Sequence, residues 1–170
     1  TLKPIPLDIK DEIEFEQYED PRVLVHNNKI YVSCATYTHD KFHLIHQKML
    51  VFDENFNHID NIHFQYGFNG KNRDKNNGKE KNWTFFVQND KLMCVYKMSP
   101  HTVVEFSWTG EVISEYIAHT DIQSNWPFGL CRGGSNPIYK DGHYHCFFHS
   151  SIYWKNGKNR FRVEDILALF

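Results

Sequence analysis

Three segments of the chain repeat one local pattern, and this repeat limits the fold more than any other feature of the sequence. Each segment reads as a polar anchor, a short strand-like run, a two-residue turn and a second run. The segments are residues 20–34, 82–96 and 136–148, with turns at Asn27-Asn28, Asn89-Asp90 and Asp141-Gly142. Because Asn, Asp and Gly tolerate the positive φ of tight turns, the pattern predicts three β-hairpins.

A second hairpin follows the first in two of the three repeats. Residues 48–52 lead into a turn at 53–55, and residues 101–108 lead into Thr109-Gly110 and a further run at 111–116. One unit is therefore four antiparallel strands, and Asp90 lies 62 positions after Asn28 while Gly142 lies 52 positions after Asp90. Four-stranded blades of β-propellers repeat at about 40–50 residues. A β-sandwich would share the strand density but not the recurring polar anchor.

We predict an all-β chain that forms a partial β-propeller of about two to three four-stranded antiparallel blades. The blades would span residues 18–66 and 80–118, with a partial blade at 130–160, in a single domain over residues 1–170. Only residues 163–170 have helical periodicity. Propellers close with about four to eight blades. We therefore expect the rest of the propeller to come from a longer chain or from a second copy in a homo-oligomer.

Charge and composition exclude several classes of protein. The 19 Lys and Arg residues against 21 Asp and Glu give a net charge of −2, which excludes a polybasic nucleic-acid binder. No apolar run approaches the roughly 20 residues of a membrane-spanning helix, so no membrane partner is expected. Aromatic residues make up 16% of the chain, which favours strands. Four cysteines without a C-x-x-C pair predict free buried thiols, a reducing compartment and a cytoplasmic location.

The polar anchors of the three units are the candidate functional site. In a propeller the first strand of each blade lines the central channel, so residues 19–22, 80–83 and 132–137 would converge there. Burying Asp, Lys and Arg side chains is costly unless they pair or bind a ligand. The anchors therefore indicate a ligand site at the channel. The alternative is mutual pairing of Asp20 with Lys81 or Arg132, with no further function.

The anchor motifs, in this order, resemble those of a known enzyme family. Glu19-Asp20-Pro21-Arg22 precedes a V-x-V-x-N-x-K-I-Y strand, Lys81-Asn82-Trp83 follows, and Arg132-Gly133-Gly134 comes three residues before Pro137. Over about residues 18–151 the chain is similar to glycoside hydrolase family 130, which holds β-mannoside phosphorylases and β-1,2-mannosidases on a five-bladed propeller, and to related β-1,2-mannosyltransferases. The resemblance implies a partial five-bladed propeller. It also implies a carbohydrate-active enzyme that acts on β-mannosides or their oligosaccharides by phosphorolysis or glycosyl transfer.

The resemblance assigns roles to two residues. Asp20 matches the general acid, which must be protonated to donate to the glycosidic oxygen, and Lys81 matches a lysine that helps to bind phosphate. Inorganic phosphate would be a co-substrate, so no cofactor is expected. Cationic side chains must hold the attacking anion, and amides suit sugar hydroxyls. The local candidates for these binding roles are Arg22, Arg132, His101, Asn82, Asn136 and His149. Trp83 and Trp126 either stack on a sugar ring or, as is commoner for a lone Trp, pack in the core.

Other functions stay open at this stage. Phosphorylases of the family carry further arginines after Glu-Asp-Pro-Arg, whereas residues 34–51 contain none and offer Lys41, Lys48, His39, His43 and His46 instead. An inverting glycoside hydrolase of the same fold would need a second carboxylate about 6.5–9.5 Å from Asp20, for which Glu80 and Asp121 are candidates. A non-catalytic glycan-binding propeller fragment is the third alternative. His143 and His145 share one face of a predicted strand, but no third ligand has a suitable spacing, so we expect no metal.

Overall fold

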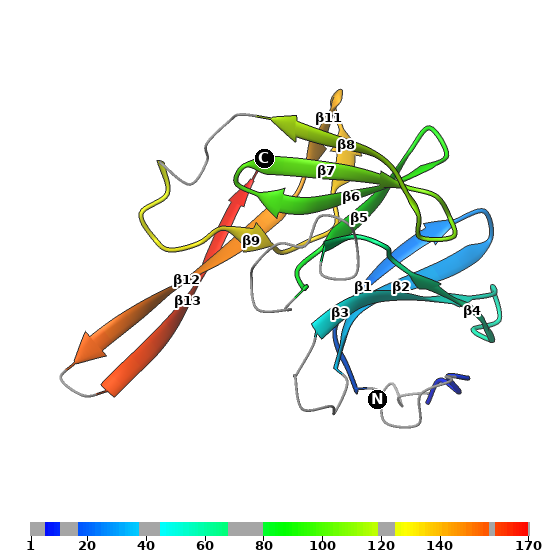
Figure 1. Cartoon of the computed structure of the whole chain (residues 1–170), viewed down its shortest axis with the longest axis horizontal. Coiled ribbons are helices and arrows are strands. Elements are labelled where there is room, and N and C mark those ends of the chain that lie inside the picture. Colours follow the sequence, from blue (N-terminus) through cyan, green and yellow to red (C-terminus); the bar gives the residue numbers. More distant parts are fainter. Residues whose placement is uncertain are drawn as a thin grey trace. The chain divides into compact units, whose positions relative to one another are not determined.

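A computed structural model describes residues 6–10, 17–37, 45–67, 80–118, 125–156 and 159–169 of the chain (Figure 1). Every regular element with described bounds is a β-strand, which confirms the all-β prediction. No helix in this part of the chain is long and apolar enough to cross a membrane. The chain divides into two compact units, Thr1–Lys81 with Trp108–Glu111, and Asn82–Ser107 with Val112–Phe170. The single domain over residues 1–170 stays a prediction.

The first unit contains a four-stranded antiparallel sheet in the order β1-β2-β3-β4. Its strands are β1 (Gln17–His26), β2 (Lys29–Tyr37), β3 (Ile45–Phe52) and β4 (His58–His63). Asn27 and Asn28 have φ angles of 47° and 57°, as a two-residue hairpin turn requires. In the turn after β3, the carboxylate of Asp53 accepts hydrogen bonds from the backbone N–H groups of Asn55 and Asn57 at 2.9 and 2.8 Å. The predicted unit of two hairpins is therefore confirmed for this sheet.

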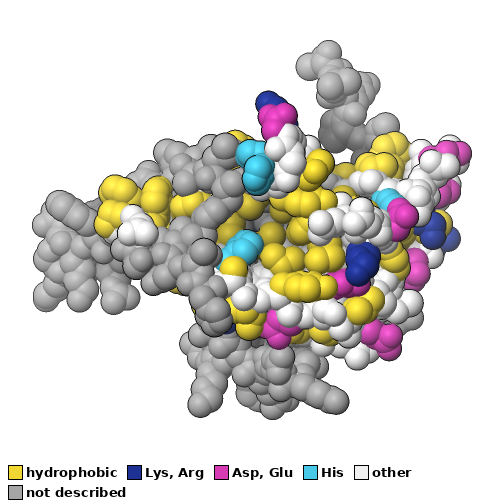
Figure 2. Space-filling view, turned by 90° about the horizontal axis from the view of Figure 1, so that it is seen from above, with side chains coloured by type: hydrophobic (Ala, Val, Ile, Leu, Met, Phe, Trp, Pro, Cys, Tyr) yellow, Lys and Arg dark blue, Asp and Glu magenta, His cyan; other side chains and the backbone are white. Residues whose placement is uncertain are grey.

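The second unit contains a matching antiparallel sheet in the order β5-β6-β7-β8. Its strands are β5 (Thr84–Gln88), β6 (Lys91–Met98), β7 (His101–Phe106) and β8 (Val112–Ala118). Hydrophobic side chains are exposed on the face drawn in Figure 2. In the second sheet, β8 exposes Val112, Ile113, Tyr116 and Ile117. The second four-stranded unit is thus confirmed as well. Closure of such sheets into a propeller stays a prediction.

The third repeat departs from this four-stranded pattern. The Asp141-Gly142 turn joins β10 (Ile138–Lys140) to β11 (His143–His145) as predicted. The next strand, β12 (Phe147–Asn156), pairs instead with β9 (Arg132–Gly133) and with β13 (Asn159–Leu169). The helical periodicity of residues 163–170 is therefore misleading, because residues 163–169 lie in β13 and residue 170 is outside the described residues. Pairing with β12 gives the backbone of β13 hydrogen-bond partners along the strand, and this tertiary pairing overrides the local helical periodicity.

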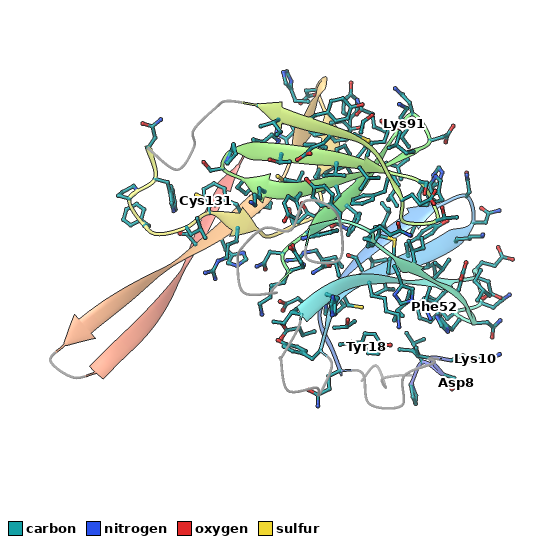
Figure 3. The ribbon with its side chains drawn as sticks, viewed as in Figure 1. Asp8, Lys10, Tyr18, Phe52, Lys91 and Cys131 are labelled. Carbon is teal, nitrogen blue, oxygen red and sulfur yellow. The ribbon has the colours of Figure 1, made fainter. Side chains whose placement is uncertain are left out.

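One face of the first sheet covers a small hydrophobic core. The core consists of Cys34, Leu50 and Phe52, with Ile9, Tyr18, Ile30 and Val32 packed against it. Figure 3 shows Tyr18 and Phe52 on the side of the sheet where Lys10 lies. The backbone N–H of Lys10 donates to Nδ1 of His58 at 3.1 Å. This contact ties the N-terminal segment 6–10 to β4.

The opposite face of the first sheet carries the turn between β7 and β8. This turn, Trp108–Glu111, belongs to the first unit. The ring of Trp108 stacks on His26, with centroids 4.9 Å apart and planes 7° apart, and lies 4.9 Å from the ring of Tyr31. Gly110 has a φ angle of 91°, and a Cβ at this position would collide with a backbone carbonyl oxygen at the end of β4. Only glycine therefore allows the turn to approach the sheet this closely.

The second unit packs around its own core of sulfur-containing, aromatic and aliphatic side chains. These are Phe86, Met93, Val95, Met98, Cys131, Cys146 and Phe148. All four cysteines of the chain are free and buried, as the sequence predicts. Burial raises the pKa of the Cys131 and Cys146 thiols, which keeps them protonated and unreactive.

Candidate functional site

A β-bulge in β1 positions the predicted general acid. Two residues of β1, Asp20 and Pro21, lie opposite a single residue of β2. Asp20 has a φ angle of 53°, a left-handed conformation that aspartate tolerates in turns but that is restricted before a proline such as Pro21. Bulges redirect side chains, and strained backbone is concentrated at functional sites. The exposed carboxylate of Asp20 thus occupies a special position in an otherwise regular strand.

The bulge also brings Glu19 and Arg22 to the same face of the sheet. Residues three apart in a regular strand point to opposite faces, and the extra residue of the bulge cancels this difference. Glu19 pairs with Ala35 of β2, and Ala35 pairs with Gln47 of β3. Because paired residues share a face, these three side chains form one row across the sheet. Ala35 is small and buried, so the longer side chains on either side of it can approach one another.

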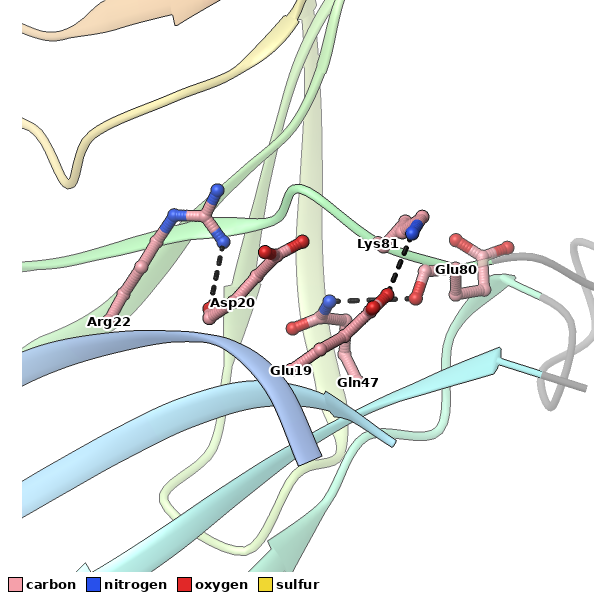
Figure 4. A network of polar contacts seen from close by, with 6 residues as sticks. All are labelled: Glu19, Asp20, Arg22, Gln47, Glu80 and Lys81. Carbon is pink, nitrogen blue, oxygen red and sulfur yellow. Dashed lines mark hydrogen bonds and ion pairs between the residues drawn. The ribbon is translucent and has the colours of Figure 1, made fainter. Parts of the chain in front are cut away.

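Glu19 and Lys81 form an ion pair above this row (Figure 4), with Nζ 2.7 Å from Oε1. Burial raises the pKa of Glu19, but hydrogen bonds from Lys81 and Tyr37 and the charge of Lys81 outweigh it and lower the pKa overall. Burial lowers the pKa of Lys81, but its hydrogen bond to Glu19 and nearby negative charge, including that of Asp20, raise the pKa overall. Both groups are therefore charged near neutral pH. A fixed cation lies within electrostatic reach of Asp20.

We call Glu19, Asp20, Arg22, Gln47, Glu80 and Lys81 the Asp20 cluster (Figure 4). Nη1 of Arg22 donates to the backbone oxygen of Asp20 at 3.4 Å. The backbone N–H of Glu80 donates to the carbonyl oxygen of Ile45 at 2.9 Å, which holds the Glu80-Lys81 segment against β3. The carboxylate of Glu80 lies against Gly67, where a Cβ would collide with it. The first unit thus brings together three of the predicted site residues, Asp20, Arg22 and Lys81.

Gln47 contributes an unsatisfied polar atom to the Asp20 cluster. The side chain is only 6% exposed. Its Nε2 donates to the backbone oxygen of Glu80 at 3.5 Å, whereas its Oε1 is buried and has no hydrogen-bond partner among the described residues. An unpaired buried acceptor costs about 1–3 kcal/mol. A buried polar atom without a partner is uncommon in native structures. Its place beside the ion pair suggests that a ligand binds there.

The second unit holds Asn82 and Asn136 at the start of β5. Asn82 has a φ angle of 66° and directly precedes Trp83 and β5. Gly133 of β9 lies so close to the carbonyl oxygen of Asn82 that a Cβ would collide with it. Oδ1 of Asn136 accepts a hydrogen bond from the backbone N–H of Phe85 at 3.2 Å. The side-chain oxygen predicted to bind a sugar hydroxyl is therefore used to anchor β5.

Arg132 and His149 are partners across the ladder between β9 and β12. Paired residues share a face, so the two half-buried side chains are neighbours. His101 begins β7, two strands away from β5 in the second sheet, which corresponds to roughly 10 Å. Burial lowers the pKa of His101. This favours the neutral imidazole over the cation that phosphate binding would need.

Of the two tryptophans that are candidates for sugar stacking, Trp83 is buried in the second unit and Trp126 packs, partly buried, against the core of that unit. Trp83 is 2% exposed, and its ring stacks on Phe106 at a centroid distance of 6.0 Å and an angle of 16°. Nε1 of Trp126 donates to Oγ of Ser150 at 2.8 Å, and the ring meets Phe148 edge to face. For Trp83 the core-packing alternative is therefore correct.

Several other candidates from the sequence do not join the Asp20 cluster. Lys48 and His46 pair with Cys34 and Thr36, which places them on the opposite face of the sheet from Gln47. Lys41, His39, His43 and Asp121 lie outside the described residues. Within the described ranges, no group of three or more His, Cys, Asp or Glu is placed to hold a metal ion.

Sequence reasoning missed Gln47 and Tyr37. The sequence predicts a strand only from residue 48, whereas β3 begins at Ile45, so Gln47 falls outside the predicted element. A glutamine that continues a run of buried strand residues is the signal that could have identified it. Tyr37 at the end of β2 carries no motif, and its role follows only from its hydrogen bond to Glu19.

The predicted site residues thus form two groups, one in each unit. Asp20, Arg22 and Lys81 lie in the first unit, and the second holds Asn82, His101, Arg132, Asn136 and His149. Convergence of the three anchors on one channel stays a prediction. No protein-family model, curated protein or solved structure matches the chain.

Proposed function

We propose that this chain acts on β-mannosides as a carbohydrate-active enzyme, by phosphorolysis or glycosyl transfer, with Asp20 as the general acid. The observation that carries the proposal is the bulge at Asp20, which places a carboxylate on strained backbone beside the Glu19–Lys81 ion pair. Such strain costs about 1–3 kcal/mol and persists where the surrounding structure maintains it, most often at functional sites. The order of the three anchor motifs supports the same assignment.

In the proposed reaction, protonated Asp20 gives its proton to the glycosidic oxygen, directly or through a sugar hydroxyl. The bond between this oxygen and the anomeric carbon breaks as a phosphate oxygen forms a new bond to that carbon. The products are mannose 1-phosphate and the shortened sugar. In glycosyl transfer, the hydroxyl of an acceptor sugar takes the place of phosphate. Lys81 and Arg22 are the cations of the Asp20 cluster that would hold the phosphate anion.

Inverting hydrolysis is the second candidate function. The presence of the Glu80 carboxylate in the Asp20 cluster favours it. Hydrolysis needs a carboxylate that activates water on the face of the sugar opposite the acid. Glu19 is engaged by Lys81 and Tyr37, and Glu80 places a second carboxylate in the same cluster, against Gly67. Hydrolysis therefore predicts that Glu80→Gln abolishes the release of free mannose.

The products formed from β-1,2-mannobiose test these proposals. Wild-type protein should form mannose 1-phosphate when phosphate is present, and Asp20→Asn should lower the rate by about 10²–10⁴-fold. Asp60→Asn is the matched control, because Asp60 is an exposed carboxylate on β4 whose Oδ1 accepts a backbone hydrogen bond that asparagine can also accept. Its rate should equal that of the wild type.

Each remaining outcome selects another function. Equal rates for the wild type and Asp20→Asn would remove Asp20 from the chemistry. Release of free mannose without phosphate would replace phosphorolysis with hydrolysis. Sugar binding that survives Asp20→Asn, with no turnover in any protein, would favour a glycan-binding module and refute the enzymatic proposal.

A further inference from the structure

We infer that Gln47 binds a hydroxyl group of the sugar that occupies the Asp20 cluster. The inference rests on the proposed function for the nature of the ligand, but it concerns binding and not catalysis. Gln47 belongs to none of the anchor motifs. It is identified by the structure alone, as a buried amide with one satisfied and one unsatisfied atom.

The burial of Gln47 makes its unpaired oxygen informative. The side chain is 6% exposed, so bulk water does not solvate the amide freely. A buried polar atom normally has a protein or ordered-water partner. Leaving Oε1 unpaired therefore costs stability in the unliganded protein, and a ligand hydroxyl that donates to it would remove this cost.

One hydrogen bond orients the amide of Gln47. Nε2 donates to the backbone oxygen of Glu80, which cannot donate in return, so Oε1 must be the atom that turns away. In the view of Figure 4 this oxygen points away from Glu80, toward the side where Asp20 and Arg22 are drawn. A reversed amide would leave its NH₂ group unpaired instead, so one polar atom is open in either orientation.

The row across the sheet places the amide near the residue that precedes Asp20. Glu19, Ala35 and Gln47 are consecutive partners in the ladders of β1, β2 and β3. The Cβ atoms of paired residues are about 4.5–5.5 Å apart, so Gln47 lies about two strand spacings from β1. A monosaccharide ring with its hydroxyls spans a similar distance. Carboxylates, cations and an amide together offer both acceptors and donors, which suits a ligand whose hydroxyl groups both donate and accept.

Sugar affinity and thermal stability of the Gln47→Met variant, compared with those of the wild type, test this inference. Methionine has a similar length but no hydrogen-bonding amide. It should weaken the binding of β-1,2-mannobiose, measured by titration calorimetry, by about 2- to 12-fold, which is the loss of one hydrogen bond. The Tm of the unliganded protein should change little, because the variant removes both the hydrogen bond to the backbone oxygen of Glu80 and an acceptor that has no partner among the described residues.

A matched control separates binding from packing. Met49 lies two residues further along β3 on the same face and is fully buried. Met49→Leu keeps the volume of the side chain approximately, and it should leave the affinity for mannobiose unchanged. Gln47→Leu provides a second apolar replacement at the position of interest and should behave like Gln47→Met.

The possible results distinguish failure of this inference from failure of the proposed function. Unchanged mannobiose affinity in both Gln47 variants would overturn the role of Gln47. A fall in Tm with affinity lost equally in Met49→Leu would also overturn it, because the residue would then act through packing alone. Binding that is weakened only by the Gln47 variants, without turnover in the wild type, would support Gln47 and refute the catalytic proposal. Failure of the wild type to bind the sugar would refute both.

Discussion

Removal of the Glu19–Lys81 ion pair should show how firmly Lys81 is held beside Asp20. Nζ and Oε1 are 2.7 Å apart, and the side chains of Lys81 and Glu19 are 35% and 32% exposed. At this distance the Coulomb energy is about 6 kcal/mol for an effective dielectric constant of 20 and about 1.5 kcal/mol in water. About a third of each side chain is exposed, so solvent screening, desolvation and lost side-chain entropy remove most of this gain. We expect a net coupling of about 1 kcal/mol, at the upper end of values for exposed pairs.

A double-mutant cycle measures this coupling directly. Glu19→Gln, Lys81→Met and the double variant should be compared with the wild type by urea denaturation. Each single variant should lower the free energy of unfolding by about 1 kcal/mol. The double variant should be more stable than the sum of the single effects predicts. Strict additivity of the two substitutions would refute an energetically coupled pair.

The same pair predicts a pH dependence whose sign follows from the two pKa shifts. Folding lowers the pKa of Glu19 below its ordinary value of 4.5, so its contribution is present above that value and is lost as the pH falls through the folded pKa. Folding raises the pKa of Lys81 above its ordinary value of 10.5, so its contribution is present below that value and is lost as the pH rises through the folded pKa. The stability difference between the wild type and Glu19→Gln should therefore be largest between these limits. A difference that persists undiminished in strong acid would contradict this reasoning.

Other predictions concern the second unit. Gly133→Ala should cost about 2–3 kcal/mol, because the new Cβ would collide with the backbone oxygen of Asn82, whereas Gly142→Ala, with open space around it, should cost only about 1 kcal/mol of backbone strain. Equal losses of unfolding free energy in urea would show that the collision is relieved. Tyr116→Phe should cost about 1 kcal/mol by the same measurement, because the half-exposed phenol donates to the buried carboxylate of Glu105 at 3.0 Å. The four buried cysteines should react with a thiol reagent only after denaturation, and rapid labelling of the native protein would contradict their burial.

The hairpins were predictable from the sequence because local chemistry determines them. Asn27-Asn28, Asn89-Asp90 and Asp141-Gly142 all adopt positive φ in the structure, and each residue type tolerates this conformation without help from tertiary contacts. The four-stranded order of the first two sheets follows, since short turns join neighbouring antiparallel strands.

The remaining features depend on contacts that distant residues provide. Residues 163–170 have a helical pattern, but their strand conformation comes from pairing with β12. The face on which Arg22 lies could not be inferred from its spacing to Glu19, because it depends on the bulge at Asp20. Gln47 belongs to no sequence motif, and its importance follows from an atom that has no hydrogen-bond partner among the described residues. Strand register and the hydrogen bonding of buried polar groups depend on contacts in the folded chain. A single sequence therefore gives little information about them.

The Trp108 turn has a consequence for the order in which the protein can fold during synthesis. The first unit includes Thr1–Lys81 and then Trp108–Glu111, so its last four residues are made after β5, β6 and β7. At about 5–20 residues per second, the intervening residues 82–107 take roughly one to five seconds to synthesise. Until then the rings of His26 and Tyr31 lack the indole that stacks on them in the finished protein. A fragment that ends at Lys81 would retain this exposed aromatic surface permanently.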